Sequence, residues 1–425
     1  MLLVSLLLSF SSAQACGQST HVWTSLHALE HLPDGPLHDL LSRDALRPML
    51  VHGTMFPDGG YSPISRHPYG ENAHWEPFHS RYLQWIEQNH DDPTTGEGAE
   101  HLAFLMGMIS HGIGDQVFDA AYLTRSQVYD ADIPGGWAQS NVDFASDVAM
   151  VARVGPQPLL DAWVPWSTMV TLFEEHGVPV DEATLRRGQE SLRIAIATVG
   201  GLGSDPESAA PHIDAYPWAN AHLLDVDVPG SPACVGQVVA NFWQIWWDRL
   251  HGGFNLEDRP LIATMPTEGA GHHPRDASHI SSMISLVVSV GLEASSVSND
   301  LVTLTGDDGD EIPVDVRLYY RQDSHVLNIQ PQEDLAEDTI YTLRLLPGLE
   351  GIDGSVYTGE GSLRFSTGLP LGGYDPNKVP VPADPDAADP TVCGCAQGSR
   401  LPYASAALLA LISLRRRSPA PTAPA

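Results

Sequence analysis

Cysteine is scarce in this 425-residue chain, which contains only Cys16, Cys234, Cys393 and Cys395. Four thiols in so long a chain do not resemble the dense set of bridges that holds small secreted domains together. A hydrophobic core, with bound metal as a further contribution, must therefore stabilise the fold.

Basic residues are also few: 21 Lys and Arg stand against 53 Asp and Glu, which gives a formal net charge of −32. Such a surface repels nucleic acid and anionic membranes at long range. The charge balance therefore argues against a nucleic-acid partner and suits a secreted protein that must stay soluble, but it says nothing about the fold.

The apolar runs at residues 2–10 and 401–414 are both short for a membrane-spanning helix, which needs about 20 residues. The first run precedes Ala13-Gln14-Ala15, a small-residue cleavage pattern, and together they predict a secretory signal peptide over residues 1–15 and export from the cell. Its start carries no Lys or Arg, unlike most such signals. Cleavage would make Cys16 the new N-terminus; a lipoprotein signal, in which Cys16 is acylated, is the alternative.

The end of the chain has three parts. Residues 369–392 are rich in Pro and Asp and predict an unstructured linker. Residues 393–425 then contain Cys393-Gly394-Cys395, the second apolar run and three consecutive arginines from Arg415. This tail resembles the Cys-containing C-terminal sorting signals of myxobacterial surface proteins. The resemblance implies removal of the tail and anchoring or release at the cell surface; a plain tail anchor is the alternative.

Residues 16–258 have the patterning of a helical domain. Amphipathic segments at 166–175, 182–198 and 235–250 alternate with turns rich in Gly, Pro and Asp, and no sustained alternation of period two appears. We expect an all-α domain of eight or more helices.

The helix expected over residues 103–119 carries His111 and Asp115 four residues apart, so both project from one face. Asp119 continues that line one turn later. An imidazole and a carboxylate at this spacing can bind a divalent metal ion. The pattern alone is weak, because most such pairs are capping or solvated residues.

Other candidate ligands precede and follow this helix. His21 lies in CGQSTH, Asp58 in FPDGGY and His74 in HWEPF, while WAQSNVDFASDV contains Asp143 and Asp147. Each has an ordinary explanation when taken singly. Asp58 can be a turn residue, the two histidines can be core or surface residues, and Asp143 can be a helix N-cap.

Together, the segments CGxSTH, HALE, FPDGGY, HWEPF and AFLMGMISHGIGD resemble the zinc-dependent phospholipase C/D family, closely over residues 16–119 and less so towards residue 258. The resemblance implies an all-α domain like that of phospholipase C and P1 nuclease. It also implies one zinc bound by Asp58, His74, His111 and Asp115, and a second bound by the Cys16 backbone, His21 and Asp115. Asp58 would also act as general base or orient the attacking water.

The third metal site of that family has different residues here. Asp119 stands where the family has a histidine, and Gln139 and Asp143 stand where it has a histidine and an acid. Asp119 and Asp143, with Asp147, form an oxygen-rich set that favours Ca²⁺ or another hard cation over zinc. Loss of this site is the alternative.

The expected activity is hydrolysis of phospholipids by metal-activated water, with the membrane or cell surface as partner; cleavage of C or D type stays open. The alternatives are a P1-type zinc nuclease and a catalytically inactive binding or adhesion protein. Aromatic residues flank the candidate ligands and can form either a lipid-facing mouth or core: Trp23, Phe56, Tyr61 and Trp75.

Residues 259–368 change to short segments of strand type. Seven of them, separated by Gly, Asp and Pro turns, predict a β-sandwich. DLAEDTIYTLRL, GLEGIDGS and LRFSTG resemble the bacterial Ig-like domain of surface proteins, which implies a spacer or adhesive module. Asp307, Asp308 and Asp310 form an acidic hairpin loop or, alternatively, a Ca²⁺ site.

Overall fold

The computed structural model describes residues 17–320 and 323–372. Its helical part ends with α14 and its strands begin at Leu261, so the expected all-α part followed by an all-β part is confirmed. The expected signal peptide, Cys16, most of the linker and the tail lie outside the described residues. In the part that the structure describes, no helix is long and apolar enough to cross a membrane.

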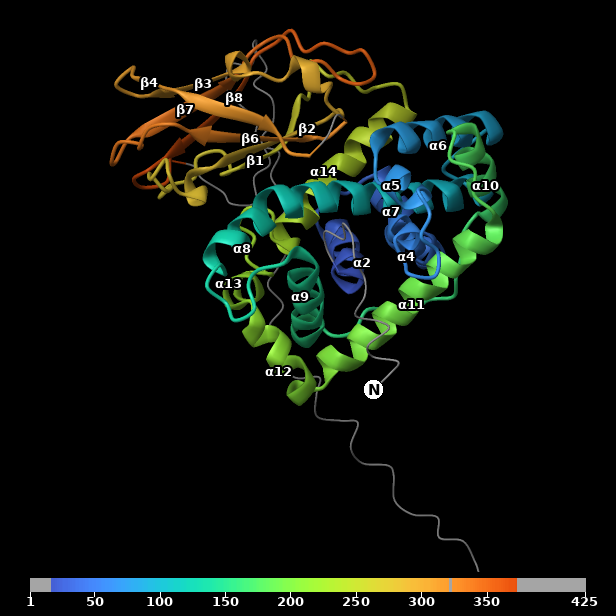
Figure 1. Cartoon of the computed structure of the whole chain (residues 1–425). Helices are drawn as coiled ribbons and strands as arrows, with labels where there is room; N and C mark the ends of the chain where they lie inside the picture. Colours follow the sequence, from blue (N-terminus) through green and yellow to red (C-terminus); the bar gives the residue numbers. More distant parts are fainter. Residues whose placement is uncertain (1–16, 321–322, 373–425) are drawn as a thin grey trace, which may run out of the picture. The chain divides into compact units, whose positions relative to one another are not determined.

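The described residues of the helical part form eight or more helices, as expected, and Figure 1 shows the longest of them, α11, running from beside α10 to α12. Its main helices are α2 (Gln18–Ala28), α3 (Pro36–Leu41), α4 (Arg47–Met55), α5 (Tyr69–Ala73), α6 (Glu76–Asn89), α7 (Gly96–Val117), α8 (Thr124–Tyr129), α9 (Gln139–Val154), α10 (Trp166–Glu175), α11 (Glu182–Ser204), α12 (Pro206–Ala215), α13 (Pro217–Ala221) and α14 (Pro232–Leu250).

Helix α7 lies at the centre of the helical part. Nearly all of its residues are buried, as expected for a helix that is apolar on most of its circumference. Its neighbour α4 comes unusually close, because Gly107 faces the Leu50 carbonyl and Gly53 faces the Phe104 carbonyl, where any Cβ would clash. After Val117 the chain continues as a π-helix, η4 (Phe118–Leu123), instead of the single α-helix expected to residue 119.

The β part is a sandwich of two four-stranded antiparallel sheets, in the orders β1-β2-β6-β5 and β4-β3-β7-β8. All seven expected strands are present, and β4 is an additional two-residue strand. The strands are β1 (Leu261–Met265), β2 (Ile284–Val288), β3 (Val302–Gly306), β4 (Glu311–Ile312), β5 (Val314–Leu318), β6 (Val326–Pro331), β7 (Ile340–Leu345) and β8 (Gly361–Ser366).

Two main cores stabilise this arrangement. The core of the sandwich contains Leu286, Leu304, Leu343 and Phe365. The core of the helical part also includes Ile262, Met265, Val287 and Val326 from the strands. The helical and β parts therefore share buried apolar surface, unlike domains joined by a flexible spacer.

Candidate metal centre

Four of the predicted ligands converge on one buried point: Asp58, His74, His111 and Asp115. His111 and Asp115 lie one turn apart on α7. Asp58 lies in the 3₁₀ turn η3 (Phe56–Gly60) after α4, and His74 lies between α5 and α6. Each of these residues offers one ligand atom, and the four atoms lie within 4.8 Å of one another.

The spacing of the four ligand atoms is narrow. His74 Nε2 lies 3.0 Å from His111 Nε2, 3.5 Å from Asp58 Oδ1 and 3.3 Å from Asp115 Oδ2. His111 Nε2 lies 3.6 Å from Asp58 Oδ1 and 3.4 Å from Asp115 Oδ2. Two carboxylate oxygens and two ring nitrogens therefore face a common centre.

Backbone carbonyls orient both histidine rings. His111 Nδ1 lies 2.6 Å from the Thr54 carbonyl oxygen, and His74 Nδ1 lies 2.6 Å from that of Gly70. A ring nitrogen that donates to a carbonyl carries its hydrogen there, so Nε2 is the nitrogen that each ring turns towards the cluster. The close approach of α4 to α7 places the Thr54 carbonyl in this position.

The two carboxylates favour the protonated, positively charged form of the neighbouring histidines. Burial by itself lowers the pKa of each histidine, but Asp115 and Asp58 raise it to about 10 for His74 and to about 9 for His111. Burial would raise the pKa values of the Asp58 and Asp115 carboxyls, yet the neighbouring histidines hold both below the ordinary value. The site is thus an anionic pocket that stabilises positive charge.

Asp115 also faces His21, the residue predicted to bind a second ion. His21 Nε2 lies 2.9 Å from Asp115 Oδ1, while Oδ2 faces the four-atom centre. Neither His21 Nε2 nor Asp115 Oδ1 has a hydrogen bond of acceptable direction among the described residues. The Cys16 amine, the other predicted ligand on this side, lies outside those residues.

Asp58 is fully buried, and a hydrogen bond to the oxygen that faces away from the cluster fixes its carboxylate. The Gln18 amide donates to Asp58 Oδ2, while Asp58 Oδ1 has no hydrogen-bond partner among the described residues. Of the four ligands, only Asp115 has appreciable exposure, with 13 % of its side chain accessible. Solvent therefore reaches the cluster mainly past Asp115.

The remaining acidic candidates lie next to this cluster. Asp119, in η4, accepts a hydrogen bond from Gln139 at 3.0 Å, and burial together with the charge of Asp115 raises its pKa to about 8. Asp143 is buried with no hydrogen bond to either oxygen among the described residues. Burial first, and then Asp119 and Asp115, raise its pKa well above the ordinary value.

One interpretation of these residues was wrong, and a metal-binding role for Asp147 stays a prediction. Asp143 is not an N-cap, because α9 begins four residues earlier at Gln139. Asp147 instead accepts hydrogen bonds from the Thr20 backbone and hydroxyl at 2.7 and 2.9 Å and from the Ser19 backbone at 3.2 Å. Asp147 therefore caps α2, the helix that carries His21, and needs no metal to explain it.

Sequence reasoning missed several residues around the cluster. Gln18 was not singled out, although it is three residues before His21, and the orienting carbonyls of Thr54 and Gly70 leave no mark on side-chain patterns. Nor was Tyr319 assigned to the site; it follows β5, and its interaction with Asp119 lowers the pKa of that carboxyl. Of the flanking aromatic residues, Phe56 is core, whereas Tyr61 packs near His74 with ring centroids 5.4 Å apart.

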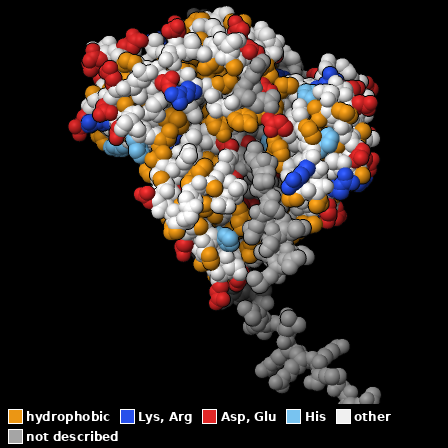
Figure 2. Space-filling model, in the orientation of Figure 1, with side chains coloured by type: hydrophobic (Ala, Val, Ile, Leu, Met, Phe, Trp, Pro, Cys, Tyr) orange, Lys and Arg blue, Asp and Glu red, His pale blue; other side chains and the backbone are white. Residues whose placement is uncertain are grey.

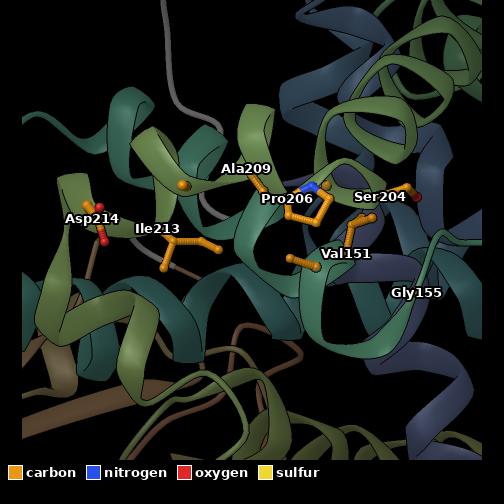
Figure 3. A pocket seen from close by; sticks show the side chains of 10 residues that line it. Val151, Gly155, Ser204, Pro206, Ala209, Ile213 and Asp214 are labelled. Atoms are coloured by element: carbon orange, nitrogen blue, oxygen red, sulfur yellow. The ribbon is translucent and has the colours of Figure 1, made fainter.

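A surface pocket of about 480 Å³ lies elsewhere, between α9, the end of α11 and α12 (Figure 3). It is lined mainly by small and apolar side chains, such as Val151, Pro206, Ala209 and Ile213, with Asp214 as its one acidic residue. It shares no residue with the ligand cluster and brings no reactive groups together.

Comparison with known proteins finds relatives that match part of the chain. Phosphatidylinositol-glycan-specific phospholipase D from Mus musculus is 32 % identical over 185 residues, which are 41 % of this chain and 22 % of that protein. The Rattus norvegicus protein of that name is 35 % identical over 189 residues, with the same coverage. The chain therefore spans less than a quarter of the length of these relatives.

Residues 260–367 match the family model of the bacterial Ig-like domain. A crystal structure of CopC from Methylosinus trichosporium OB3b covers 25 % of this chain and 90 % of that chain, at 14 % identity and a TM-score of 0.18, which is too low to support an argument. The chain is thus homologous, over part of its length, to phosphatidylinositol-glycan-specific phospholipase D and ends its described part in a bacterial Ig-like domain.

Proposed function

We propose that this chain is a metal-dependent phosphodiesterase of the phospholipase C/D class that hydrolyses phospholipids. The observation that carries the proposal is the convergence of Asp58, His74, His111 and Asp115 on one buried point. The partial homology to phospholipase D supports the same class of substrate.

The ion at this point is zinc in the proposal. Ligand atoms about 2.05 Å from zinc, at the corners of a tetrahedron, lie about 3.3 Å from one another. The five distances given above range from 3.0 to 3.6 Å. Two histidine nitrogens with two carboxylates are also a donor set that zinc accepts, and Asp58 Oδ1 is a buried acceptor with no other hydrogen-bond partner among the described residues.

A second zinc would be bound by His21, Asp115 Oδ1 and the backbone of Cys16, which requires Cys16 to be a free N-terminus. A third ion of the hard type would be bound by Asp119 and Asp143. The support for the third site is the Asp143 carboxylate, buried without a hydrogen-bond partner in the described part of the chain. Such a group is costly unless a cation or a proton neutralises it.

The chemistry follows from these groups. A bound zinc ion supplies Lewis acidity towards the phosphoryl oxygen and lowers the pKa of a bound water to about 7. Asp58 stays ionised because His111 and His74 lower its pKa, and Gln18 fixes its orientation, so it can orient or deprotonate the attacking water. The partly exposed Asp115 marks the side on which the phosphodiester binds.

Two other functions are less well supported. A P1-type nuclease needs an anionic polymer to approach a chain of net charge −32, and Figure 2 shows acidic side chains in several groups over the face in view. A catalytically inactive adhesion protein would have no need of a complete, buried set of four ligands. Secretion and attachment to the cell surface through the tail belong to the proposal as well, since phospholipid is the substrate.

The direct test is metal analysis of the purified protein together with hydrolysis of phosphatidylcholine and of a chromogenic phosphocholine ester. We expect bound zinc, loss of turnover with a chelator and recovery on adding zinc. Asp115→Asn should lower kcat by at least about 10³-fold, because it weakens the ligand shared by two ions. No zinc and no turnover, with none restored by added metal, would refute the proposal.

Product analysis separates the two cleavage types: diacylglycerol indicates C-type cleavage and phosphatidic acid indicates D-type cleavage. Mass spectrometry of the mature N-terminus tests the second metal site. A free amine on Cys16 agrees with that site, whereas an acylated Cys16 or an uncleaved leader contradicts it.

A further inference from the structure

The Ig-like domain contacts two segments of the helical part that carry candidate metal ligands. The first contact involves Glu76, two residues after His74, which begins α6 and is buried. Its carboxylate forms an ion pair with Arg249 of α14, accepts a hydrogen bond from the Gly291 backbone at 2.6 Å and lies 3.1 Å from His325 Nε2. Two of these three partners, Gly291 and His325, belong to the Ig-like domain.

The second contact involves Gln116, the residue after Asp115. Its side-chain oxygen accepts hydrogen bonds from the His325 backbone at 2.7 Å and from the Ser324 hydroxyl at 3.2 Å. His325 therefore joins the two segments that carry His74 and Asp115: its ring faces Glu76 and its backbone faces Gln116. The other ring nitrogen of His325 lies 3.0 Å from the Val288 carbonyl, which fixes the ring within the sheet.

The hairpin formed by β5 and β6 supplies further contacts near the same point. The Tyr319 side chain interacts with Asp119, and the Asn328 amide donates to the Ala120 carbonyl at 3.2 Å. The Tyr320 ring stacks on Trp75, with centroids 5.8 Å apart and planes inclined by 5°. Trp75 is the residue between His74 and Glu76, so this contact also bears on the His74 segment.

We propose that the Ig-like domain helps to position the ligands of the metal centre. In this proposal His325 contacts Glu76 and Gln116 and thereby fixes the segments that carry His74 and Asp115. The inference rests on the proposed metal-dependent function and differs from the spacer or adhesive role expected for this module. Residues that do not touch the metal but hold its ligands in place set the orientation of those ligands. Their mutation lowers metal affinity about 10- to 100-fold.

The physical reason is the cost of leaving these groups without partners. Glu76 is a buried charge, so removing one of its partners leaves part of that charge uncompensated. The α6 start can then shift to recover hydrogen bonds from water, and His74 lies two residues away. A shift of about 0.5 Å in the position of His74 is enough to disturb a metal site, because its ligands must be held within about that distance of their working positions.

The test compares His325→Ala and Gln116→Ala with a control, His273→Ala, in the full-length protein. His273 is also a buried histidine of the Ig-like domain, its ring lies 3.1 Å from the Ser282 carbonyl, and it contacts neither Glu76 nor Gln116. The measurements are zinc affinity by chelator competition, the visible spectrum of the Co²⁺-substituted protein, kcat and KM, and Tm.

We expect His325→Ala and Gln116→Ala to weaken zinc binding by about tenfold or more, to alter the Co²⁺ spectrum and to lower kcat more than they raise KM. His325→Gln, whose amide can still donate to Glu76, should recover part of the affinity. His273→Ala should lower Tm by a comparable amount without changing zinc affinity or the spectrum. Variants at 325 and 116 that lower Tm only, as the control does, would overturn the inference.

The outcomes distinguish this inference from the proposed function. A wild-type protein that binds zinc but hydrolyses no phospholipid refutes the function alone, and the zinc affinities of the variants still decide the inference. A wild-type protein that binds no metal refutes both.

Discussion

At the scale of single residues, glycines determine how closely the backbone approaches the candidate metal ligands. Gly112, next to His111 on α7, faces the His74 carbonyl, and a Cβ there would collide with it. Gly114, two residues later, has room: a Cβ would meet Val235 and His21 atoms at 3.6 Å or more. The two positions therefore differ in steric tolerance on the same helix.

Gly112→Ala should lower the free energy of unfolding by about 1–3 kcal/mol and weaken zinc binding, because His74 must move away from the new methyl group. Gly114→Ala should be neutral or slightly stabilising, since alanine favours a helix over glycine by about 1 kcal/mol. Urea unfolding and chelator competition measure both effects. If the two variants had the same free energy of unfolding and the same zinc affinity, this explanation would be wrong.

At the scale of elements, the start of α2 depends on a residue 127 positions away. Its N-cap residue, Gly17, has no side chain to cap the helix. Asp147 of α9 instead accepts the hydrogen bonds from the backbone N–H groups of Ser19 and Thr20. Gly17 is required at this place, because a Cβ would collide with the Asp147 side chain. His21 is thus positioned by the packing of α2 against α9.

Asp147→Ala should destabilise the protein by about 1–3 kcal/mol, because the buried backbone donors of Ser19 and Thr20 lose their acceptor. Asp147→Asn keeps an acceptor oxygen and should cost less, with metal content unchanged. Thermal unfolding and metal analysis of the two variants measure this. A loss of bound metal in Asp147→Asn at normal stability would show that Asp147 is a ligand after all.

At the scale of the whole molecule, pH acts on the metal-free protein through groups that bind protons more tightly when folded. The folded pKa values are about 10 for His74 and about 9 for His111, above the ordinary 6.5, and about 8 for Asp119, above the ordinary 3.8. Between about pH 7 and about pH 8 the folded state therefore binds more protons than the unfolded chain, and stability falls as pH rises. The two histidines extend this loss through about pH 9 and 10.

We expect the Tm of the chelated protein to fall from about pH 7 to about pH 9, while the zinc-loaded protein changes less, because the ion replaces the protons and binds more tightly as they leave. His21, whose pKa is lowered by burial, titrates below this window and does not oppose the trend. Scanning calorimetry with and without chelator measures the difference in Tm between the two forms. A Tm difference that narrows with rising pH would contradict the role of His74 and His111 as metal ligands.

Much of this molecule could be predicted from the sequence, because the relevant signals are local. Helical periodicity gave α10 its bounds and placed His111 and Asp115 on one face of α7, and alternation located the seven strands of the sandwich. The π-helix after Val117 was missed, since one extra residue per turn leaves no compositional trace. Asp119 lies in this π-helix and accepts a hydrogen bond from Gln139.

The sequence by itself indicated the candidate ligands and determined that a helical part precedes an Ig-like sandwich. Only the tertiary structure decided which ligands meet, that Asp147 caps α2, and that His325 of the Ig-like domain lies against Glu76 and Gln116. The physical reason is range: periodicity acts over one or two turns, whereas buried charges and backbone donors find partners wherever the packed chain brings them, here up to 215 residues apart.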